Sequence, residues 1–249
     1  MHPELVRLHY LGIERPIYSY GALVVAGIAV GILVGVWRAP RFGLARFDEL
    51  AVGLLGVVGG LVGAVVLFDL VQWRAIVADP SLLIHPGLVF YGGLFGGAAA
   101  AWGYCRAYRL SIVDAADAGA PGLALGHAIG RIGCLLGGCC YGRVVDEKFP
   151  LAVHLAGAWR HPVQLYEAAG LVLIAIVTAM LPRRRAGAIF LAYVASYALV
   201  RLVVEHWRGD DLERGVVAHA LSTSQLIAIV ALAGSAALLY RVVSKKGAT

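Results

Sequence analysis

The sequence has few charged residues for its length. Only 14% of its 249 residues are charged and 60% are hydrophobic, so the mean hydropathy reaches +0.80. Ordinary soluble domains are about 25% charged and about 45–50% apolar. A soluble protein of this size could not cover so much apolar surface with polar groups. The composition therefore excludes a disordered chain, a basic nucleic-acid-binding module and a soluble enzyme, and it indicates a membrane protein.

Paired cysteine signatures are also absent. The chain has four cysteines, of which Cys134, Cys139 and Cys140 share one stretch and Cys105 lies apart. No C-x-x-C pair occurs, which argues against a zinc ribbon and against a thioredoxin-like redox site. We expect Cys105 to be a buried packing residue. A disulfide between Cys134 and Cys139 or Cys140 remains an alternative if their loop faces an oxidising compartment.

Long apolar runs are abundant. A membrane-spanning helix needs about 20 mostly apolar residues. The runs are continuous and do not alternate, which excludes the strands of a membrane barrel. Nothing in the composition divides the chain. The sequence predicts an all-α polytopic membrane protein with a single domain over residues 1–249 and seven spans, approximately at 18–37, 50–71, 88–108, 115–136, 163–181, 186–204 and 221–243.

Basic residues in the loops predict the orientation. Loops on the side of the C-terminus carry 11 basic residues, among them the triple Arg183–Arg185, and loops on the other side carry 9. Cytoplasmic loops of membrane proteins are enriched in Lys and Arg. We therefore expect the N-terminus to lie outside and the C-terminus inside.

Glycines recur every four residues in several apolar runs, as at Gly27 and Gly31, at Gly59 and Gly63, and at Gly92 and Gly96. This spacing places small residues on one helix face, where helix backbones approach closely in lipid. Close helix packing is the favoured interpretation for the first two spans. Around 91–97, where polar groups lie nearby, contact with a lipid tail or headgroup remains an alternative.

Ionisable residues inside apolar segments are costly and therefore indicate function. Three clusters contain such residues, at 127–143, 160–167 and 197–208. Tyr197, Arg201 and Glu205 recur every four residues and so share one helix face. Arg131 is expected at the end of the weakest span, followed by a stretch rich in glycine and cysteine that is not expected to be regular helix.

Arg201 has two interpretations. It can form a structural ion pair with Glu205, one helical turn away. It can also bind an anion together with Arg131, because planar guanidinium groups bind phosphate oxygens in pairs. Two arginines near one bilayer face favour the second interpretation, and a phospholipid headgroup is the anion most readily available there.

Several motifs resemble the prolipoprotein diacylglyceryl transferase family. They occur in the family's order over most of the chain, and any one of them alone would be weak evidence. The matching segments are Tyr20-Gly21, Tyr91-Gly92-Gly93-Leu94, Gly130-Arg131-Ile132-Gly133 with Gly142-Arg143, His161-Pro162-Val163-Gln164-Leu165-Tyr166-Glu167, and the set Tyr197, Arg201, Glu205 and Arg208.

The resemblance implies a specific reaction. Members of this family transfer the diacylglyceryl group of phosphatidylglycerol to the lipobox cysteine in the signal peptide of a prolipoprotein, and they release glycerol phosphate. It also implies a multi-pass protein of the bacterial cytoplasmic (inner) membrane, among membrane lipids, with no nucleic-acid partner. We expect no cofactor and no metal, because two guanidinium groups can stabilise the departing phosphate.

The resemblance also assigns residues. The expected catalytic residues are Arg131, Arg201, Glu205, Tyr91 and His127. The expected substrate-binding residues are Tyr20, Gly92, Gly93, Cys134, Cys139, Gly142, Arg143, Gln164, Tyr166, Glu167, Tyr197 and Arg208.

The sequence departs from the family at three of these positions. Tyr91 replaces the family's histidine, and Cys134 and Cys139 stand where well-known members carry Asn and Glu. Tyrosine, with an ordinary pKa near 10, is a poor base at neutral pH. The candidate bases are therefore Glu205, His127 and Glu167, in that order.

Three alternatives remain open at this stage. One is a membrane protein that binds or transports phospholipid without transferase chemistry. Another is a paralogue with a different acceptor. The third is a membrane thiol oxidoreductase that uses Cys134, Cys139 and Cys140.

Overall fold

The computed structural model describes residues 4–10, 13–84, 87–209, 216–217 and 221–244. Each of the seven predicted apolar segments overlaps one long helix. These helices are α1 (Ser19–Arg38), α2 (Arg46–Val71), α4 (Phe90–Ala107), α5 (Ile112–Gly137), α6 (Val163–Met180), α7 (Ala188–Glu205) and α9 (Thr223–Ser244).

Five of the described helical segments are long and apolar enough to cross a membrane. They are Ser19–Phe42, Arg46–Val71, Val163–Met180, Ala188–Glu205 and Thr223–Ser244. The mostly helical fold and these segments confirm a helical membrane protein. The count of seven crossings and the orientation stay predictions.

The remaining described elements are short. Three two-stranded antiparallel hairpins connect or precede the helices: β1 (Glu4–Tyr10) with β2 (Ile13–Tyr18), β3 (Val153–Leu155) with β4 (Ala158–Arg160), and β5 (Val216–Val217) with β6 (Leu221–Ser222). Helix α3 (Trp73–Ala78) and the 3-10 turns η1 (Ala39–Phe42) and η2 (Pro80–Leu83) complete the set. The sequence did not predict the hairpins, because their apolar pattern is too short to differ from that of a loop.

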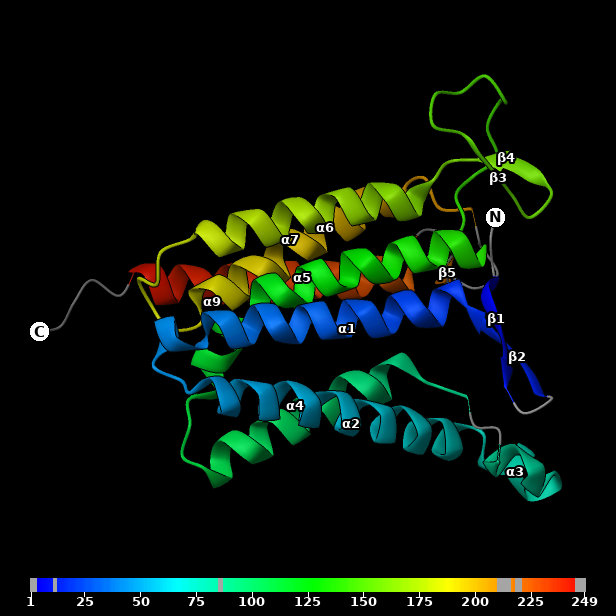
Figure 1. Cartoon of the computed structure of the whole chain (residues 1–249). Helices are drawn as coiled ribbons and strands as arrows, with labels where there is room; N and C mark the ends of the chain where they lie inside the picture. The colour runs from blue at the N-terminus through cyan, green and yellow to red at the C-terminus, as the bar shows by residue number, and fades with distance from the viewer. Residues whose placement is uncertain (1–3, 11–12, 85–86, 210–215, 218–220, 245–249) are drawn as a thin grey trace, which may run out of the picture. The chain divides into compact units, whose positions relative to one another are not determined.

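The chain forms two compact units. One contains Met1–Val34 and Gly119–Thr249, and the other contains Gly35–Ala118. Figure 1 traces the elements of each unit along the chain. The prediction of a single domain over the whole chain stays a prediction.

In the Gly35–Ala118 unit, α2 and α4 pack through glycines. A side chain on Gly96 would meet the carbonyl oxygen of Gly59, and its Cβ would lie 2.9 Å from the Cα of Gly63. Gly92 faces Gly63 in the same way, and a Cβ on Gly93 would lie 3.7 Å from the Cβ of Ala64. The packing interpretation of the glycine spacing is therefore confirmed for this helix pair.

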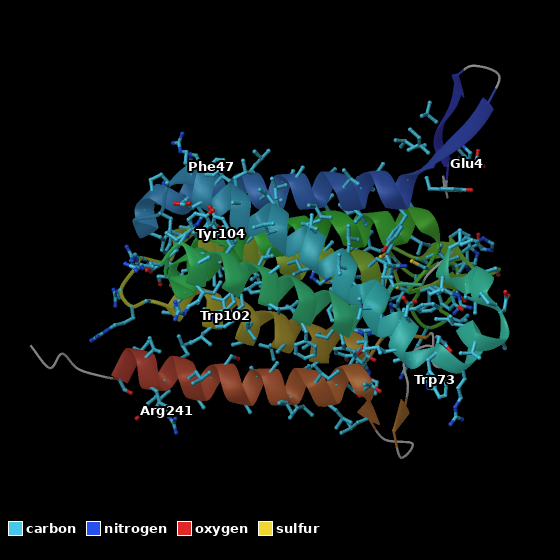
Figure 2. The ribbon with its side chains drawn as sticks, turned by 90° about the horizontal axis from the view of Figure 1, so that it is seen from below. Glu4, Phe47, Trp73, Trp102, Tyr104 and Arg241 are labelled. Atoms are coloured by element: carbon cyan, nitrogen blue, oxygen red, sulfur yellow. The ribbon has the colours of Figure 1, made fainter. Side chains whose placement is uncertain are left out.

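Apolar side chains cover the outer surface of this unit. Phe47, Trp73 and Trp102 are more than half exposed, with exposed fractions of 74%, 56% and 58% (Figure 2). In water such a surface would aggregate, whereas in a bilayer it contacts lipid tails.

In the other unit, the core lies among α1, α5, α6 and α7. A Cβ on Gly27 would come within 2.5 Å of the Gly126 carbonyl oxygen, so α1 and α5 touch backbone to backbone. Ala124 and Ala128 of α5 pack with Leu171 and Ala175 of α6 in a buried cluster. These small contact residues allow α5 and α6 to approach closely, which brings the polar residues near their ends within reach of one another.

Candidate active site

Glu167 is a buried carboxylate that contacts several polar side chains from α5 and α7. Its Oε1 lies 2.9 Å from Arg131 Nη2, and its Oε2 lies 3.7 Å from Arg201 Nη1. The Tyr197 hydroxyl donates a hydrogen bond to Oε1 at 2.9 Å, and His127 Nε2 lies 3.9 Å from the same oxygen. The sequence had ranked Glu167 last among three candidate bases, and the fold makes it the shared partner of both arginines.

Three helix ends place these side chains together. Arg131 lies in the last two turns of α5, Glu167 lies in the first turns of α6, and Arg201 lies in the last turns of α7. The core contacts of α5 and α6 hold these ends side by side. Residues from three separate sequence clusters therefore form one site, as the sequence predicted for Arg131 and Arg201.

The expectation for the stretch after Arg131 is confirmed in part. Helix α5 continues through Cys134 to Gly137, close to the predicted end of the span at residue 136, and residues 138–143, which are rich in glycine and cysteine, are not helical. The helix extends to Gly137 because tertiary packing overrides the low helix propensity of glycine. A Cβ on Gly133 would lie 3.4 Å from the Tyr20 carbonyl oxygen, and one on Gly137 would lie 3.4 Å from the Tyr20 Cβ. The predicted site residue Tyr20 thus packs against the end of α5.

Arg201 has further partners beside Glu167. Its Nη2 lies 2.8 Å from Glu205 Oε2, one helical turn away, and donates a hydrogen bond to the Ser224 hydroxyl at 3.1 Å. The predicted ion pair with Glu205 is confirmed. Ser224, at the start of α9, was not predicted, because nothing in its sequence surroundings distinguishes it from other serines at a helix start.

Both arginines keep hydrogen-bonding capacity. Arg131 Nε and Arg201 Nη1 are buried and have no hydrogen-bond acceptor among the described residues. The two side chains are 15% and 11% exposed, whereas Glu167 is only 2% exposed. A buried donor without an acceptor costs free energy. The site can therefore accept an anion that supplies oxygen atoms to these two nitrogens.

The segment after α5 is fastened to the end of α7. The Arg143 backbone N–H donates to the Trp207 carbonyl at 2.8 Å, and Arg143 Nε donates to the Arg208 carbonyl at 3.3 Å. A side chain on Gly142 would collide with the His161 carbonyl oxygen, so only glycine fits this close approach. Gly142 and Arg143, predicted to bind substrate, thus hold the loop in place, and their contact with substrate stays a prediction.

Gln164 connects α6 to the cysteine stretch. Its Nε2 donates to the Cys139 carbonyl oxygen at 2.7 Å. All four cysteines are free, and Cys105 is buried, as predicted for a packing residue. The Sγ atoms of Cys134, Cys139 and Cys140 lie within 4.8 Å of one another.

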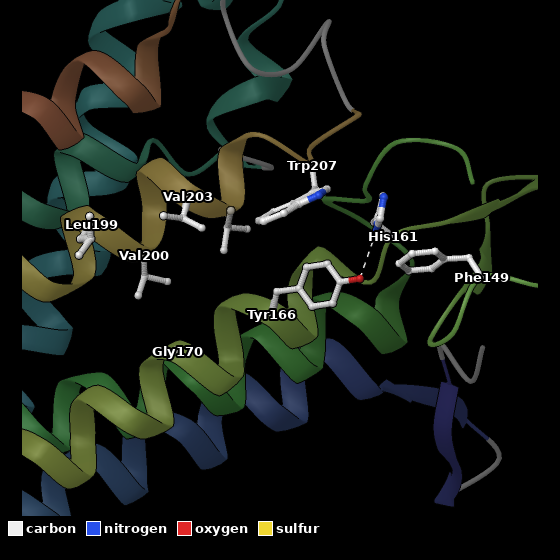
Figure 3. Close-up of a pocket in the computed structure, with 9 residues that line it drawn as sticks. Phe149, His161, Tyr166, Gly170, Leu199, Val200, Val203 and Trp207 are labelled. Carbon is white, nitrogen blue, oxygen red and sulfur yellow. Dashed lines mark hydrogen bonds between the residues drawn. The ribbon is translucent and has the colours of Figure 1, made fainter. Parts of the chain in front are cut away.

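An apolar groove lies between α6 and α7, and its lining includes the sequence neighbours of Glu167, Arg201 and Glu205. Its volume is about 530 Å³, and its lining includes Leu199, Val203 and Trp207 of the α7 side and Tyr166 of α6 (Figure 3). Tyr166 hydrogen-bonds through its hydroxyl to His161 Nδ1 at 3.2 Å. Burial and the nearby charge of Arg143 lower the pKa of His161 below its ordinary value. The sequence missed this groove, although its residues lie next to the predicted Tyr197–Arg201–Glu205 face.

The chain was also compared with known proteins. The sequence profile of the family described as "Prolipoprotein diacylglyceryl transferase" matches residues 8–241. The chain belongs to this family. The resemblance seen in the sequence motifs is therefore confirmed over almost the whole length of the chain.

Individual relatives of similar length support the assignment. The phosphatidylglycerol–prolipoprotein diacylglyceryl transferase of Clostridium tetani is 32% identical over 240 residues, which are 92% of this chain and 93% of the relative. Enzyme 2 of that name from Clostridium perfringens is 33% identical over 244 residues, with 93% of each chain covered. The enzyme of that name from Legionella pneumophila strain Lens is 30% identical over 227 residues, with 86% and 88% covered.

The segment that matches the family's His-Gly-Gly-Leu motif lies in the Gly35–Ala118 unit, whereas Arg131, Glu167 and Arg201 lie in the other unit. Tyr91, which replaces its histidine, is 38% exposed and stacks edge-on against Phe90 with ring centroids 5.6 Å apart. Gly92 and Gly93 pack against α2, as described above. The roles of Tyr91, Gly92 and Gly93 in binding or catalysis stay predictions.

Proposed function

We propose that the protein transfers the diacylglyceryl group of phosphatidylglycerol to the lipobox cysteine of a prolipoprotein, as a multi-pass protein of the bacterial cytoplasmic membrane. The observation that carries the proposal is the buried pair Arg131 and Arg201, with one unsatisfied donor each, in a member of the transferase family. In the reaction, the cysteine sulfur attacks the glycerol carbon that bears the phosphate. A C–S bond forms, the C–O bond breaks, and glycerol phosphate leaves with the electron pair.

The two arginines bind the phosphate in this proposal. The phosphodiester carries one negative charge, and the departing phosphate gains a second. Arg131 and Arg201 stabilise this added charge best if they contact the phosphate oxygens more strongly in the transition state than in the substrate. Glu167 holds both guanidinium groups in position between turnovers, since it contacts both.

His127 is the base that we propose for the thiol proton. Glu205 lies 2.8 Å from an Arg201 nitrogen, and Glu167 lies beside both arginines. A carboxylate stabilised by arginine is a poor proton acceptor. His127 Nε2 lies 3.9 Å from Glu167 Oε1, and its side chain is 32% exposed, so it is the candidate that an incoming thiol can reach most easily. This changes the order of candidate bases that the sequence suggested, in which Glu205 came first.

The groove between α6 and α7 is the proposed site for one acyl chain. It is lined by apolar side chains, and its Val200 and Val204 are direct neighbours of Arg201 and Glu205 in α7. A lipid whose phosphate contacts Arg201 can therefore lay a tail along the groove.

The purified full-length protein, incubated with phosphatidylglycerol and a lipobox peptide, should form a diacylglyceryl thioether on the peptide cysteine. Mass spectrometry measures the thioether, and an assay of released glycerol phosphate measures the second product. A peptide with serine in place of the lipobox cysteine is the control and should remain unmodified. Lipid binding with neither product would contradict transferase function and favour the lipid-binding alternative.

A bulky residue in the groove should weaken binding of long-chain lipid. Val203→Trp should exclude at least about two methylene groups, each worth about 0.8 kcal/mol, and so raise the KM for long-chain phosphatidylglycerol roughly tenfold. The KM for a short-chain analogue should change much less. Leu173→Trp, at an exposed position of α6, is the matched control. Equal KM changes for both lipids would exclude the groove as an acyl site.

A further inference from the structure

The fold brings together the sulfurs of three cysteines that share one stretch of the sequence. Cys134 lies in the last turn of α5, and Cys139 and Cys140 follow the end of that helix. Their Sγ atoms all lie within 4.8 Å of one another. We call these residues the three-cysteine cluster. Their spacing matches no familiar zinc signature, and it is the turn after α5 that brings them together.

The turn has an unusual backbone. Gly138 has a φ of +76°, and Cys140 has a φ of +57°, in the left-handed region that residues other than glycine rarely adopt. The Cys139 N–H bonds back to the Cys134 carbonyl at 3.1 Å, and Gln164 fixes the Cys139 carbonyl from α6. A left-handed residue other than glycine is strained and persists only where its surroundings enforce it. The three thiols are thus held together by the loop and do not meet by chance along a helix.

The sulfur positions suit a bound metal ion. A Zn–S bond is about 2.3 Å long, so three sulfurs around one ion lie roughly 4 Å apart. The three Sγ atoms lie within 4.8 Å of one another, so small rotations of the cysteine side chains would bring them to a separation of roughly 4 Å. Cys139 is exposed and the other two are half-buried, so an ion can reach them from outside.

A metal ion binds the thiolate form of cysteine and therefore has to displace the thiol protons. The positive charges of Arg131 and Arg208 act on the Cys140 thiol, whereas burial raises the pKa of Cys139 above its ordinary value. The same arginines can offset the surplus negative charge of three thiolates around a divalent or monovalent ion.

We propose that the three-cysteine cluster binds one thiophilic metal ion, such as Zn²⁺ or Cu⁺, through its three sulfurs. Cysteine thiolates select these soft or borderline ions over Mg²⁺ and Ca²⁺, and three protein ligands leave a position open for water or another ligand. This inference does not rest on the proposed transferase function, and it revises the expectation that the protein has no metal site.

Titration of the reduced full-length protein with Cd²⁺, a spectroscopic substitute for Zn²⁺, tests the proposal. We expect ultraviolet thiolate-to-metal absorption that saturates at one ion per chain, and competition by Zn²⁺. Bound metal should also protect three thiols from alkylation, as counted by mass spectrometry. Cys140→Ser should weaken Cd²⁺ binding at least about 100-fold, since even the loss of a residue behind a ligand costs 10–100-fold.

Two further variants keep the test decisive. Cys139→Ser removes an exposed thiol, which the fold should tolerate, and it should weaken binding as much as Cys140→Ser. Cys105→Ser removes a buried thiol from the other unit and should bind Cd²⁺ like the wild type. Unchanged affinity in Cys139→Ser and Cys140→Ser would overturn the proposal. So would a disulfide within the cluster in protein purified without reductant, detected by alkylation before and after reduction.

Discussion

Replacing either Arg131 or Arg201 with alanine is expected to lower diacylglyceryl transfer by about 10²–10³-fold or more, the usual cost of removing one group that stabilises transition-state charge. Each variant loses one of the two buried guanidinium groups that we propose as phosphate ligands. The measurement is the rate of thioether formation on a lipobox peptide under saturating phosphatidylglycerol.

Two comparisons separate binding from folding. Arg131→Lys keeps a charge but loses the planar pair of donors, so it should recover only part of the activity. Arg106→Ala removes an exposed arginine at the end of α4 and should retain wild-type activity. The variants must elute as folded protein on size-exclusion chromatography. Wild-type rates in both Arg131→Ala and Arg201→Ala would disprove the proposed phosphate site.

The sequence predicted the helices well because their cause is local. A long apolar run reports directly that a segment contacts lipid or a helix core, and each of the seven predicted runs overlaps one long helix. The sequence was ambiguous at the end of α5, where the predicted span reached residue 136 but the glycines and cysteines after Arg131 suggested irregular structure. There, packing of Gly133 and Gly137 against Tyr20 decides the structure, and that contact joins segments far apart in the chain.

The sequence predicted most residues of the candidate site but only some of the contacts between them. Buried arginines are costly in a membrane, so Arg131 and Arg201 were conspicuous in the sequence alone. The role of Glu167 was not, because its partners come from two other parts of the chain, on α5 and on α7. The sequence grouped the three cysteines as a possible redox site but did not predict that their sulfurs could share a metal ion, since a left-handed turn at Cys140 leaves no spacing signature.

Glu167 should be the most costly carboxylate to neutralise in this site. Its side chain is 2% exposed and contacts two guanidinium groups and the Tyr197 hydroxyl. Glu167→Gln keeps the shape but leaves Arg131 without the carboxylate partner that it has in this site. Removing one partner of a buried ion pair costs about 3–5 kcal/mol of the free energy of unfolding. We expect a loss of that size in chemical unfolding of the detergent-solubilised protein.

Three controls test whether this loss comes from uncompensated charge. Glu147→Gln neutralises an exposed carboxylate in the loop after α5 and should leave the free energy of unfolding nearly unchanged. Adding Arg131→Met to Glu167→Gln removes one of the unpaired charges, so the double variant should be more stable than the sum of the two single changes predicts. Inorganic phosphate should also stabilise Glu167→Gln more than the wild type, because the freed guanidinium groups can bind it. Strictly additive losses, with no extra stabilisation by phosphate, would show that Glu167 contributes through packing and not as the shared counter-charge of the two arginines.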